Sequence, residues 1–209
     1  MGAKAALIFG AMDCSDWSFL EPLRQECPTV FCADGGLTCA RKAGFLPDYY
    51  IGDGDSGGAP QPGIRATVLP VQKDLTDLQA AWEEAYELGF RNICLTGCIG
   101  GRQDHHLAAL QLLETIRLRG CEGRIMDPEN EISFLTPGKM LLQREDFSYF
   151  SLIPADAEVT VSISGAKYEL SERRVRRGDS LCVSNEFVQT PVELTLSDGS
   201  CWLILSQRK

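Results

Sequence analysis

The segment Pro47-Asp-Tyr-Tyr-Ile-Gly-Asp-Gly-Asp-Ser56 joins a short apolar run to a group of acids and glycines. Residues 49–51 favour a buried β-strand, and the glycines that follow are typical of a strand end. Asp53 and Asp55 are two positions apart, so both carboxylates project to the same side of an extended chain. The segment is typical of a sheet that binds its ligand beyond the carboxyl ends of its strands.

Similar apolar runs recur through the first part of the chain, and most of them end in glycine or aspartate. Between two of them, apolar side chains from Leu75 to Ala85 recur at spacings of three and four, which predicts a helix that stops at Gly89. A second helix is predicted over about 104–119. Strands that alternate with helices predict a parallel sheet covered on both faces. The predicted strands are 5–9, 29–33, 49–51, 67–71, 92–96 and 124–126.

After about residue 145 the apolar residues alternate with polar ones, as in 159–164 and 192–197. A period of two predicts half-buried antiparallel strands, and Asp198-Gly199 predicts a hairpin turn between two of them. We therefore expect an N-terminal parallel-sheet α/β/α domain over 1–137. A small C-terminal antiparallel β-sandwich domain is expected over 138–209.

The composition is that of an acidic globular protein, with 44% hydrophobic residues and a net charge of −9. Most of the acidic excess lies before residue 130, and this balance excludes a strongly basic nucleic-acid-binding surface. The nine cysteines contain no CxxC pair, which favours buried, reduced thiols. We find no signal peptide and no membrane span, so the sequence predicts a cytoplasmic protein with no nucleic-acid or membrane partner.

The paired acids of the opening segment favour a metal site. Asp53 and Asp55 repel each other unless a cation lies between them, and a hard divalent ion suits carboxylate and phosphate ligands. A polar turn capped by aspartates is the alternative. Gly52, Gly54 and Gly57 fit a GxGxxG pattern, but no helix is predicted after them, so we reject a dinucleotide-binding loop.

The segment Lys73-Asp-Leu-Thr-Asp77 opens the first predicted helix. Asp74 and Asp77 are spaced as a capping box, in which both acids would serve the helix N-terminus. Because the segment follows a strand, it is also expected at the same sheet edge as Asp53. There Asp77 could complete a metal site, and Lys73 could bind phosphate.

The segment Leu95-Thr-Gly-Cys-Ile-Gly-Gly-Arg-Gln-Asp-His-His106 again runs from strand through glycines to helix. Its paired glycines and Arg102 favour an anion site, since backbone N–H groups and a planar guanidinium both bind phosphate oxygens. Asp104 is expected to cap the helix. Of the adjacent His105 and His106, one is expected to contact phosphate and the other to pack or face solvent. A fourth strand ends in Asp34-Gly-Gly36 at the same edge.

The order of these motifs resembles the thiamine pyrophosphokinase family across most of the chain. Each motif is short, and the ordered set is what makes the resemblance specific. The motifs are Ala33-Asp-Gly-Gly36, Pro47-Asp48 with Gly52-Asp-Gly-Asp-Ser56, Lys73-Asp-Leu-Thr-Asp77, Thr96-Gly97 with Gly100-Gly-Arg-Gln-Asp-His105, and Ser184-Asn-Glu186.

The resemblance implies an enzyme that transfers a diphosphoryl group from ATP to the hydroxyl of thiamine, with Mg²⁺, giving thiamine diphosphate and AMP. It also implies an α/β domain followed by a β-sandwich, and a homodimer with active sites at the subunit interface. Carried over by motif, the metal ligands are Asp53, Asp55 and Asp77. The expected nucleotide site comprises Asp34, Gly35, Gly36, Lys73, Thr76, Gly100, Gly101, Arg102 and His105, with Asp74, Asp104 and Arg102 as catalytic residues and Ser184 and Asn185 at thiamine.

Two positions depart from the family pattern. Gly54 stands where a large apolar residue is usual, and Ala109 stands where an asparagine is expected. The remaining alternatives are a Mg²⁺-dependent kinase or diphosphokinase acting on another alcohol, and a non-catalytic module that binds thiamine or a nucleotide. A complete set of acids favours an enzyme, because a binding module does not need a full metal site.

Overall fold

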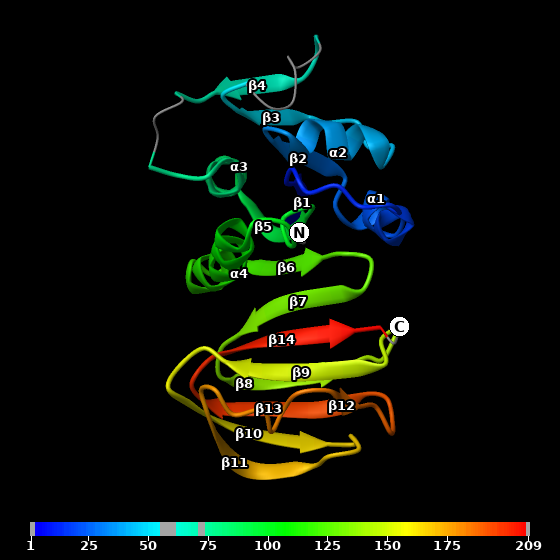
Figure 1. The fold of residues 1–209 in the computed structure, drawn as a ribbon, viewed down its shortest axis with the longest axis vertical. Coiled ribbons are helices and arrows are strands. Elements are labelled where there is room, and N and C mark those ends of the chain that lie inside the picture. Colours follow the sequence, from blue (N-terminus) through cyan, green and yellow to red (C-terminus); the bar gives the residue numbers. More distant parts are fainter. Residues whose placement is uncertain (1–2, 55–61, 71–73, 208–209) are drawn as a thin grey trace. The chain divides into compact units, whose positions relative to one another are not determined.

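The computed structural model describes residues 3–54, 62–70 and 74–207 of the chain. Its contacts divide the protein into two compact units, Met1–Pro128 and Glu129–Lys209, whose elements are labelled in Figure 1.

The sequence predicts the division after residue 137, later than the contacts place it. The difference arises at β7 (Asn130–Leu135), which follows the first unit directly. This strand pairs along its whole length with β14 (Cys201–Ser206), and the ladder of hydrogen bonds holds it in the second unit.

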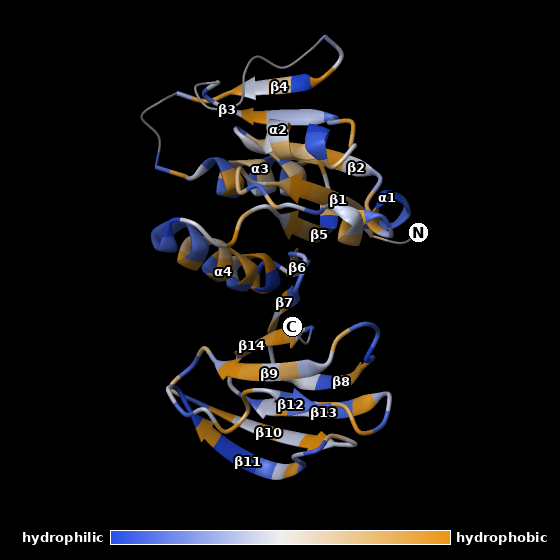
Figure 2. Ribbon diagram, turned by 45° about the vertical axis from the view of Figure 1, so that its right-hand side comes forward, coloured by the Kyte–Doolittle hydropathy of each residue, from blue (hydrophilic) through white to orange (hydrophobic). Residues whose placement is uncertain are grey.

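The first unit contains a parallel sheet, as the sequence predicts. Every predicted apolar run contributes to one of its strands. The bounds differ most at β4, which is predicted over 67–71 and spans Arg65–Val68. Figure 2 shows that β1 and β5 are hydrophobic along most of their length, as expected for strands covered on both faces. In spatial order the strands are β4 (Arg65–Val68), β3 (Tyr49–Gly52), β2 (Thr29–Ala33), β1 (Lys4–Phe9), β5 (Phe90–Thr96) and β6 (Glu122–Met126).

Helices pack on both faces of this sheet. Leu7 and Phe9 of β1 pack in one buried cluster with residues of α1 and α2. The longer α3 buries Trp82 completely and contacts β1, β2, β3 and β5. The confirmed architecture is therefore α/β/α. The helical elements are the 3-10 turn η1 (Ser18–Leu20), α1 (Leu23–Glu26), α2 (Gly36–Lys42), α3 (Asp77–Glu87) and α4 (Gln103–Leu118).

The start of α3 differs from the capping predicted for it. Its N-cap is Thr76, whose hydroxyl accepts a hydrogen bond from the Gln79 backbone N–H at 3.2 Å, so the predicted cap at Asp74 is wrong. The threonine takes this role because its extended backbone turns the hydroxyl back over the first helical turn. The apolar stripe also begins later than predicted, since Leu75 lies before the helix.

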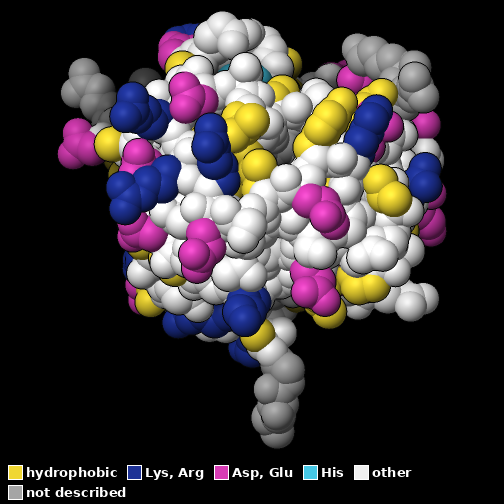
Figure 3. Space-filling model, turned by 90° about the horizontal axis from the view of Figure 1, so that it is seen from below, with side chains coloured by type: hydrophobic (Ala, Val, Ile, Leu, Met, Phe, Trp, Pro, Cys, Tyr) yellow, Lys and Arg dark blue, Asp and Glu magenta, His cyan; other side chains and the backbone are white. Residues whose placement is uncertain are grey.

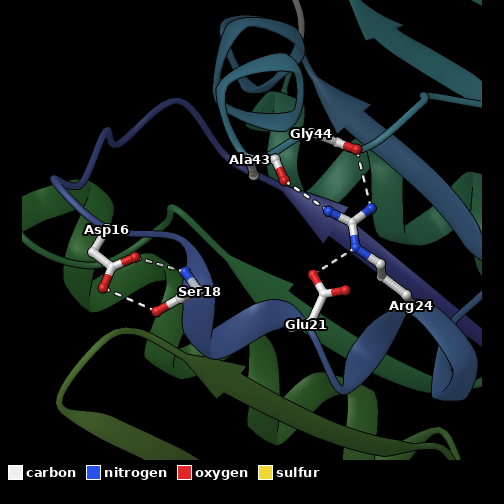
Figure 4. A network of polar contacts seen from close by, with 6 residues as sticks. All are labelled: Asp16, Ser18, Glu21, Arg24, Ala43 and Gly44. Atoms are coloured by element: carbon white, nitrogen blue, oxygen red, sulfur yellow. Dashed lines mark hydrogen bonds and ion pairs between the residues drawn. The ribbon is translucent and has the colours of Figure 1, made fainter.

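Figure 4 shows how Arg24 ties α1 to the end of α2. Its guanidinium donates to the carbonyl oxygens of Ala43 and Gly44 at 3.1 and 3.0 Å, and to Glu21 at 2.8 Å. It also stacks over the Phe45 ring at 4.1 Å. A cation at the carboxyl end of a helix satisfies carbonyl groups that have no partner within the helix. Nearby, Asp16 accepts from both the backbone and the hydroxyl of Ser18 and so orders the turn before α1.

The second unit consists of two antiparallel sheets that bury one core between them, which confirms the predicted β-sandwich. Apolar residues of both sheets, such as Phe150 and Val161, meet in that core. One sheet has the order β12 (Asn185–Glu186), β9 (Tyr149–Pro154), β14 and β7, and the other has β11 (Leu170–Arg176), β10 (Glu158–Ser164), β13 (Val192–Asp198) and β8 (Gly138–Leu142).

The hairpin predicted at Asp198-Gly199 is wrong. Gly199 does adopt a positive φ of 73°, as the turn prediction requires. However, β13 pairs with β8 and β10, whereas β14 pairs with β7 and β9. The turn therefore carries the chain from one sheet to the other, because both strands need partners and the apolar side chains of each face the shared core.

All nine cysteines are free thiols, and every one except Cys14 is buried. Burial raises the pKa of Cys32 and of Cys201 to about 12, so these thiols stay protonated at neutral pH. Among the residues that the structure describes, no helix is long and apolar enough to cross a membrane.

Gly36 is the first residue of α2 and is in direct contact with the backbone at the end of β1. A Cβ at this position would lie 2.0 Å from the carbonyl oxygen of Phe9. Because the obstacle is backbone, the helix would have to move. We expect Gly36→Ala to lower the free energy of unfolding by about 3 kcal/mol or more, measured by urea denaturation.

Gly138→Ala is the matched control, since its Cβ would come no closer than 3.8 Å to the Thr136 carbonyl oxygen. It should change the free energy of unfolding by less than about 1 kcal/mol. Equal stability of the two variants would contradict the close packing at Gly36.

Candidate active site

A pocket of about 630 Å³ opens in the first unit, at the carboxyl ends of the parallel strands. Its walls come from the loops after β1, β2 and β5 and from residues at the start of α3 and along α4. This is the edge at which open α/β sheets bind their ligands. Five residues predicted for the site line the pocket: Asp34, Thr76, Asp77, Arg102 and His105.

Asp34 follows β2 directly and is only 7% exposed. Its backbone N–H donates to the Ile51 carbonyl oxygen at 2.8 Å, and its φ of 43° is a conformation that aspartate tolerates better than most residues. One carboxylate oxygen accepts a hydrogen bond from the Tyr50 hydroxyl at 2.9 Å. Burial and this hydrogen bond raise the pKa of Tyr50, so the phenol stays a proton donor to the carboxylate.

Gly52, at the end of β3, brings the next loop against Asp34. A Cβ on Gly52 would lie 2.8 Å from the Cβ of Asp34 and 2.9 Å from the Tyr50 hydroxyl. Asp53 comes next and lies near enough to Tyr50 to contribute to its raised pKa. Asp53 is thus near Asp34 but does not line the pocket. Its predicted partner Asp55 lies outside the described residues.

The N-terminus of α3 places two predicted residues at the pocket. Thr76 is the N-cap and Asp77 is the first helical residue. Backbone N–H groups of the first turn have no partners within the helix, and together with the helix dipole they favour an anion. Asp74 is exposed and does not line the pocket, and Lys73 lies outside the described residues.

The glycine-rich loop after β5 packs tightly against the loop after β1. The backbones of Gly10 and Gly97 are in direct contact, since a Cβ on Gly10 would be 2.4 Å from the Gly97 carbonyl oxygen. The Met12 backbone N–H donates a hydrogen bond to the same oxygen at 2.8 Å, and the Met12 side chain packs against Gly101. Gly100 and Gly101 both have positive φ, so the glycines allow a backbone course that side chains would strain.

Arg102 and Asp104 form a bidentate pair at the start of α4. The guanidinium donates to the two carboxylate oxygens at 3.1 and 2.6 Å, and the His105 backbone N–H donates to one of them at 2.9 Å. These donors lower the pKa of Asp104 to about 2, so the carboxylate stays ionised above about pH 3. Asp104 therefore orients Arg102. It also accepts a hydrogen bond from a backbone N–H of the first helical turn, but it does so from within the helix, because the N-cap position is occupied by Arg102.

The two histidines have different positions, as expected from their adjacency. His105 lines the pocket. His106 instead uses its Nδ1 to accept a hydrogen bond from the Gly100 backbone N–H at 3.4 Å, which ties the glycine loop to the helix.

Sequence reasoning missed two parts of the wall. One is the loop of Gly10, Ala11 and Met12, although the run before it ends in glycine like the other strands. The other is most of a face of α4, which lines the pocket with Ala108, Gln111, Leu112 and Thr115 beside Ala109, the one position of this face that the family pattern singles out. Their helical spacing was a usable signal, but it does not distinguish a pocket wall from a core face.

The residues predicted to bind thiamine lie in the second unit. Asn185 is buried at 3% exposure, and its side-chain amide bonds the backbone of Tyr168 in both directions at 3.0 and 2.8 Å. Its oxygen also accepts from the Glu186 N–H. Ser184 is exposed, with a φ of 59°, and its backbone N–H donates to the Ser151 hydroxyl. Asn185 thus fixes the loop backbone that presents Ser184.

The carboxylates of the first unit fit a metal ion that is bound partly by protein and partly by the phosphates of a substrate. Within the described ranges, no three acids, histidines or cysteines gather closely enough to form a complete metal site. The carboxylates of Asp34 and Asp77 nevertheless line one pocket, with Asp53 beside it. Mg²⁺ commonly takes one or two carboxylates and completes its shell with water and substrate phosphate.

Comparisons with known proteins find similarity along most of the chain. The catalytic-domain model of thiamin pyrophosphokinase matches residues 20–122, and the vitamin B1 binding domain of the same enzyme matches residues 139–201. A thiamine pyrophosphokinase of Bacillus subtilis (strain 168) is 30% identical over 183 residues, which cover 83% of this chain and 85% of the relative.

Solved structures show the same fold. A thiamine pyrophosphokinase crystal structure from Bacillus subtilis aligns with a TM-score of 0.86 at 25% identity, covering 98% of this chain and 99% of the other. That of Geobacillus thermodenitrificans aligns with a TM-score of 0.85 at 28% identity, covering 98% of each chain. Two domain models in the same order and a relative matched over most of its length confirm the resemblance seen in the motifs, and the chain belongs to the thiamin pyrophosphokinase family.

Proposed function

We propose that this chain catalyses the transfer of a diphosphoryl group from ATP to thiamine. The thiamine hydroxyl oxygen forms a bond to the β-phosphorus, the bond from that phosphorus to the α,β-bridging oxygen breaks, and AMP leaves with that oxygen. The hydroxyl proton passes to water in the same step. The observation that carries this proposal is the family match over both units, together with a pocket that joins acids to an arginine.

ATP is assigned to the strand-end pocket. Phosphoryl transfer depends chiefly on positioning and on neutralising charge, which the described pocket offers through a guanidinium and a helix N-terminus. Arg102 is oriented by Asp104, and the neighbouring Gly100 and Gly101 have the positive φ that glycine adopts without strain. The residues assigned here are Asp34, Gly35, Gly36, Lys73, Thr76, Gly100, Gly101, Arg102 and His105.

The proposed metal is Mg²⁺, bound by Asp53, Asp55 and Asp77. When bound, it would neutralise charge on the transferred phosphates. The carboxylates of this chain would hold it between the loop after β3 and the start of α3. Because the protein carries a net charge of −9, ATP is expected to bind as a magnesium complex, which lowers the repulsion between substrate and protein.

The resemblance implies that Asp74 and Asp104 are catalytic, and an acid of this kind would orient the attacking hydroxyl. The carboxylate of Asp104 is already engaged by Arg102, so we assign Asp104 the positioning of that cation. Asp74 is exposed just before α3 and is our candidate for the contact with the hydroxyl.

Thiamine is assigned to the loop of Ser184 and Asn185 in the second unit, within a homodimer whose active sites lie at the subunit interface. Two exposed apolar side chains near this loop support the assignment: Tyr168 is 57% exposed and Val188 is 72% exposed. They lie on two neighbouring segments, which a β-bridge between Ala166 and Phe187 joins. Leu181 and Val183 are also exposed beside Ser184. Exposed apolar side chains grouped in this way favour a partner surface. A cytoplasmic location completes the proposal.

The reaction is tested with ATP, Mg²⁺ and thiamine, following AMP and thiamine diphosphate. We expect AMP and thiamine diphosphate in equal amounts, and no AMP without thiamine. ADP as the product would indicate a kinase, AMP formation with a different alcohol only would indicate another diphosphokinase, and no turnover would indicate a binding module.

Asp77→Asn tests the metal assignment. We expect the substitution to lower kcat/KM by about 100-fold, since a carboxylate ligand is lost while the helix start is kept. The Mg²⁺ concentration needed for half-maximal rate should rise. Glu87→Gln, at the other end of α3, is the matched control and should keep wild-type rates. An Asp77→Asn enzyme with unchanged Mg²⁺ dependence would remove Asp77 from the metal site.

Val188→Asp tests the dimer. A charge on this exposed apolar position should weaken self-association, because it would be desolvated in the interface. We expect the wild type to sediment as a dimer and the dimer dissociation constant of the variant to be about tenfold higher. The variant should lose activity when it is diluted below that concentration. Leu46→Asp is the control, because Leu46 is an apolar residue of the first unit that is 88% exposed. A wild-type monomer that retains activity at all concentrations would contradict the shared site.

A further inference from the structure

Tyr50 is a buried tyrosine that does not line the pocket but reaches a residue that does. It lies in the middle of β3, is 1% exposed, and packs in the apolar cluster of the first unit. Its hydroxyl is the polar end of an otherwise apolar side chain. A buried hydroxyl of this kind needs a partner, and it finds one in Asp34 at 2.9 Å.

The carboxylate of Asp34 has little freedom around this contact. The residue adopts a φ of 43°, and Gly52 passes so close that a Cβ there would be 2.8 Å from the Asp34 Cβ. The same Cβ would be 2.9 Å from the Tyr50 hydroxyl. The ends of β2 and β3 are therefore packed around a single hydrogen bond. A strained backbone held by such packing is a feature often found at functional sites.

We propose that Tyr50 is a positioning residue for the reaction: its hydroxyl fixes one carboxylate oxygen of Asp34, and the other oxygen is thereby presented to a hydrogen-bond donor of the substrate in the pocket. This inference rests on the proposed function. Tyr50 acts through Asp34, since the tyrosine itself is closed off from the pocket.

The physical reason is orientation. When one oxygen of a carboxylate accepts a hydrogen bond from the protein, the lone pairs of the other oxygen point in a defined direction. A carboxylate without such a bond rotates, and substrate binding must then order it. The Tyr50 hydroxyl joins β3 to the residue that follows β2, because Tyr50 lies in β3 and Asp34 comes directly after β2. Loss of the hydroxyl should thus affect turnover more than the stability of the fold.

The test is Tyr50→Phe, which keeps the ring and removes only the hydroxyl. We expect kcat/KM for diphosphoryl transfer to fall by about tenfold to 100-fold, the range for one hydrogen bond to a charged group. The melting temperature should stay within about 4 °C of the wild type.

Tyr49→Phe is the matched control on the same strand. Tyr49 stacks on Phe31 with ring centroids 4.3 Å apart, and its hydroxyl accepts from Arg65 at 2.8 Å on the exposed side. Removing that hydroxyl should leave kcat and KM within about twofold of the wild type, because Tyr49 is half-buried and its hydroxyl bonds Arg65 rather than a residue of the pocket. Equal losses in the Tyr49→Phe and Tyr50→Phe enzymes would overturn the proposal.

A double-mutant cycle separates positioning from a general structural role. Asp34→Gly removes the carboxylate and suits the positive φ at this position. If Tyr50 acts through Asp34, Tyr50→Phe should cause no further loss of rate in the Asp34→Gly enzyme, measured by product accumulation over hours. An equal loss in both backgrounds would overturn the proposal, as would a Tyr50→Phe enzyme with wild-type rates. A wild type that forms no thiamine diphosphate would instead overturn the proposed function.

Discussion

Close backbone contact at the carboxyl ends of the parallel strands is the constraint on which the site depends. Gly10 and Gly97 bring the loops after β1 and β5 together, Gly36 starts α2 against the Phe9 carbonyl, and Gly52 lies against Asp34. Each contact is shorter than a side chain allows, so space alone requires glycine at these positions, and at Gly97 the φ of 61° favours glycine as well. Without these contacts the loops would splay apart, and the residues assigned to substrate would not share one pocket.

Charge around the pocket is arranged by pairing. Arg102 is held by Asp104 through two hydrogen bonds, and Asp34 by the Tyr50 hydroxyl, so a cation and an acid are oriented before any ligand binds. Such preorganisation lowers the reorganisation needed during catalysis. Elsewhere the surface is mixed: on the face seen in Figure 3, basic and acidic side chains are interspersed, with hydrophobic ones in small groups between them.

The second unit shows how a predicted binding residue can take a supporting position. Asn185 belongs to the loop proposed for thiamine, and its amide is bonded to the Tyr168 backbone, an arrangement that no sequence spacing specifies. The partner is a residue on another segment, so only the folded chain can reveal it. The same reasoning covers Asp198-Gly199, where the turn chemistry was correctly identified but the strands on either side belong to different sheets.

The sequence by itself determined the strands of the first unit, the change to a two-residue period in the second, and the acids and glycines that end each strand. Local patterns suffice for these features because burial and backbone angles act within a few residues. The tertiary structure decided which strand ends meet, that Thr76 caps α3, that α4 supplies a wall of the pocket, and that Tyr50 reaches Asp34. Those contacts join residues far apart in the chain, and their distances follow from packing, which a single sequence does not encode locally.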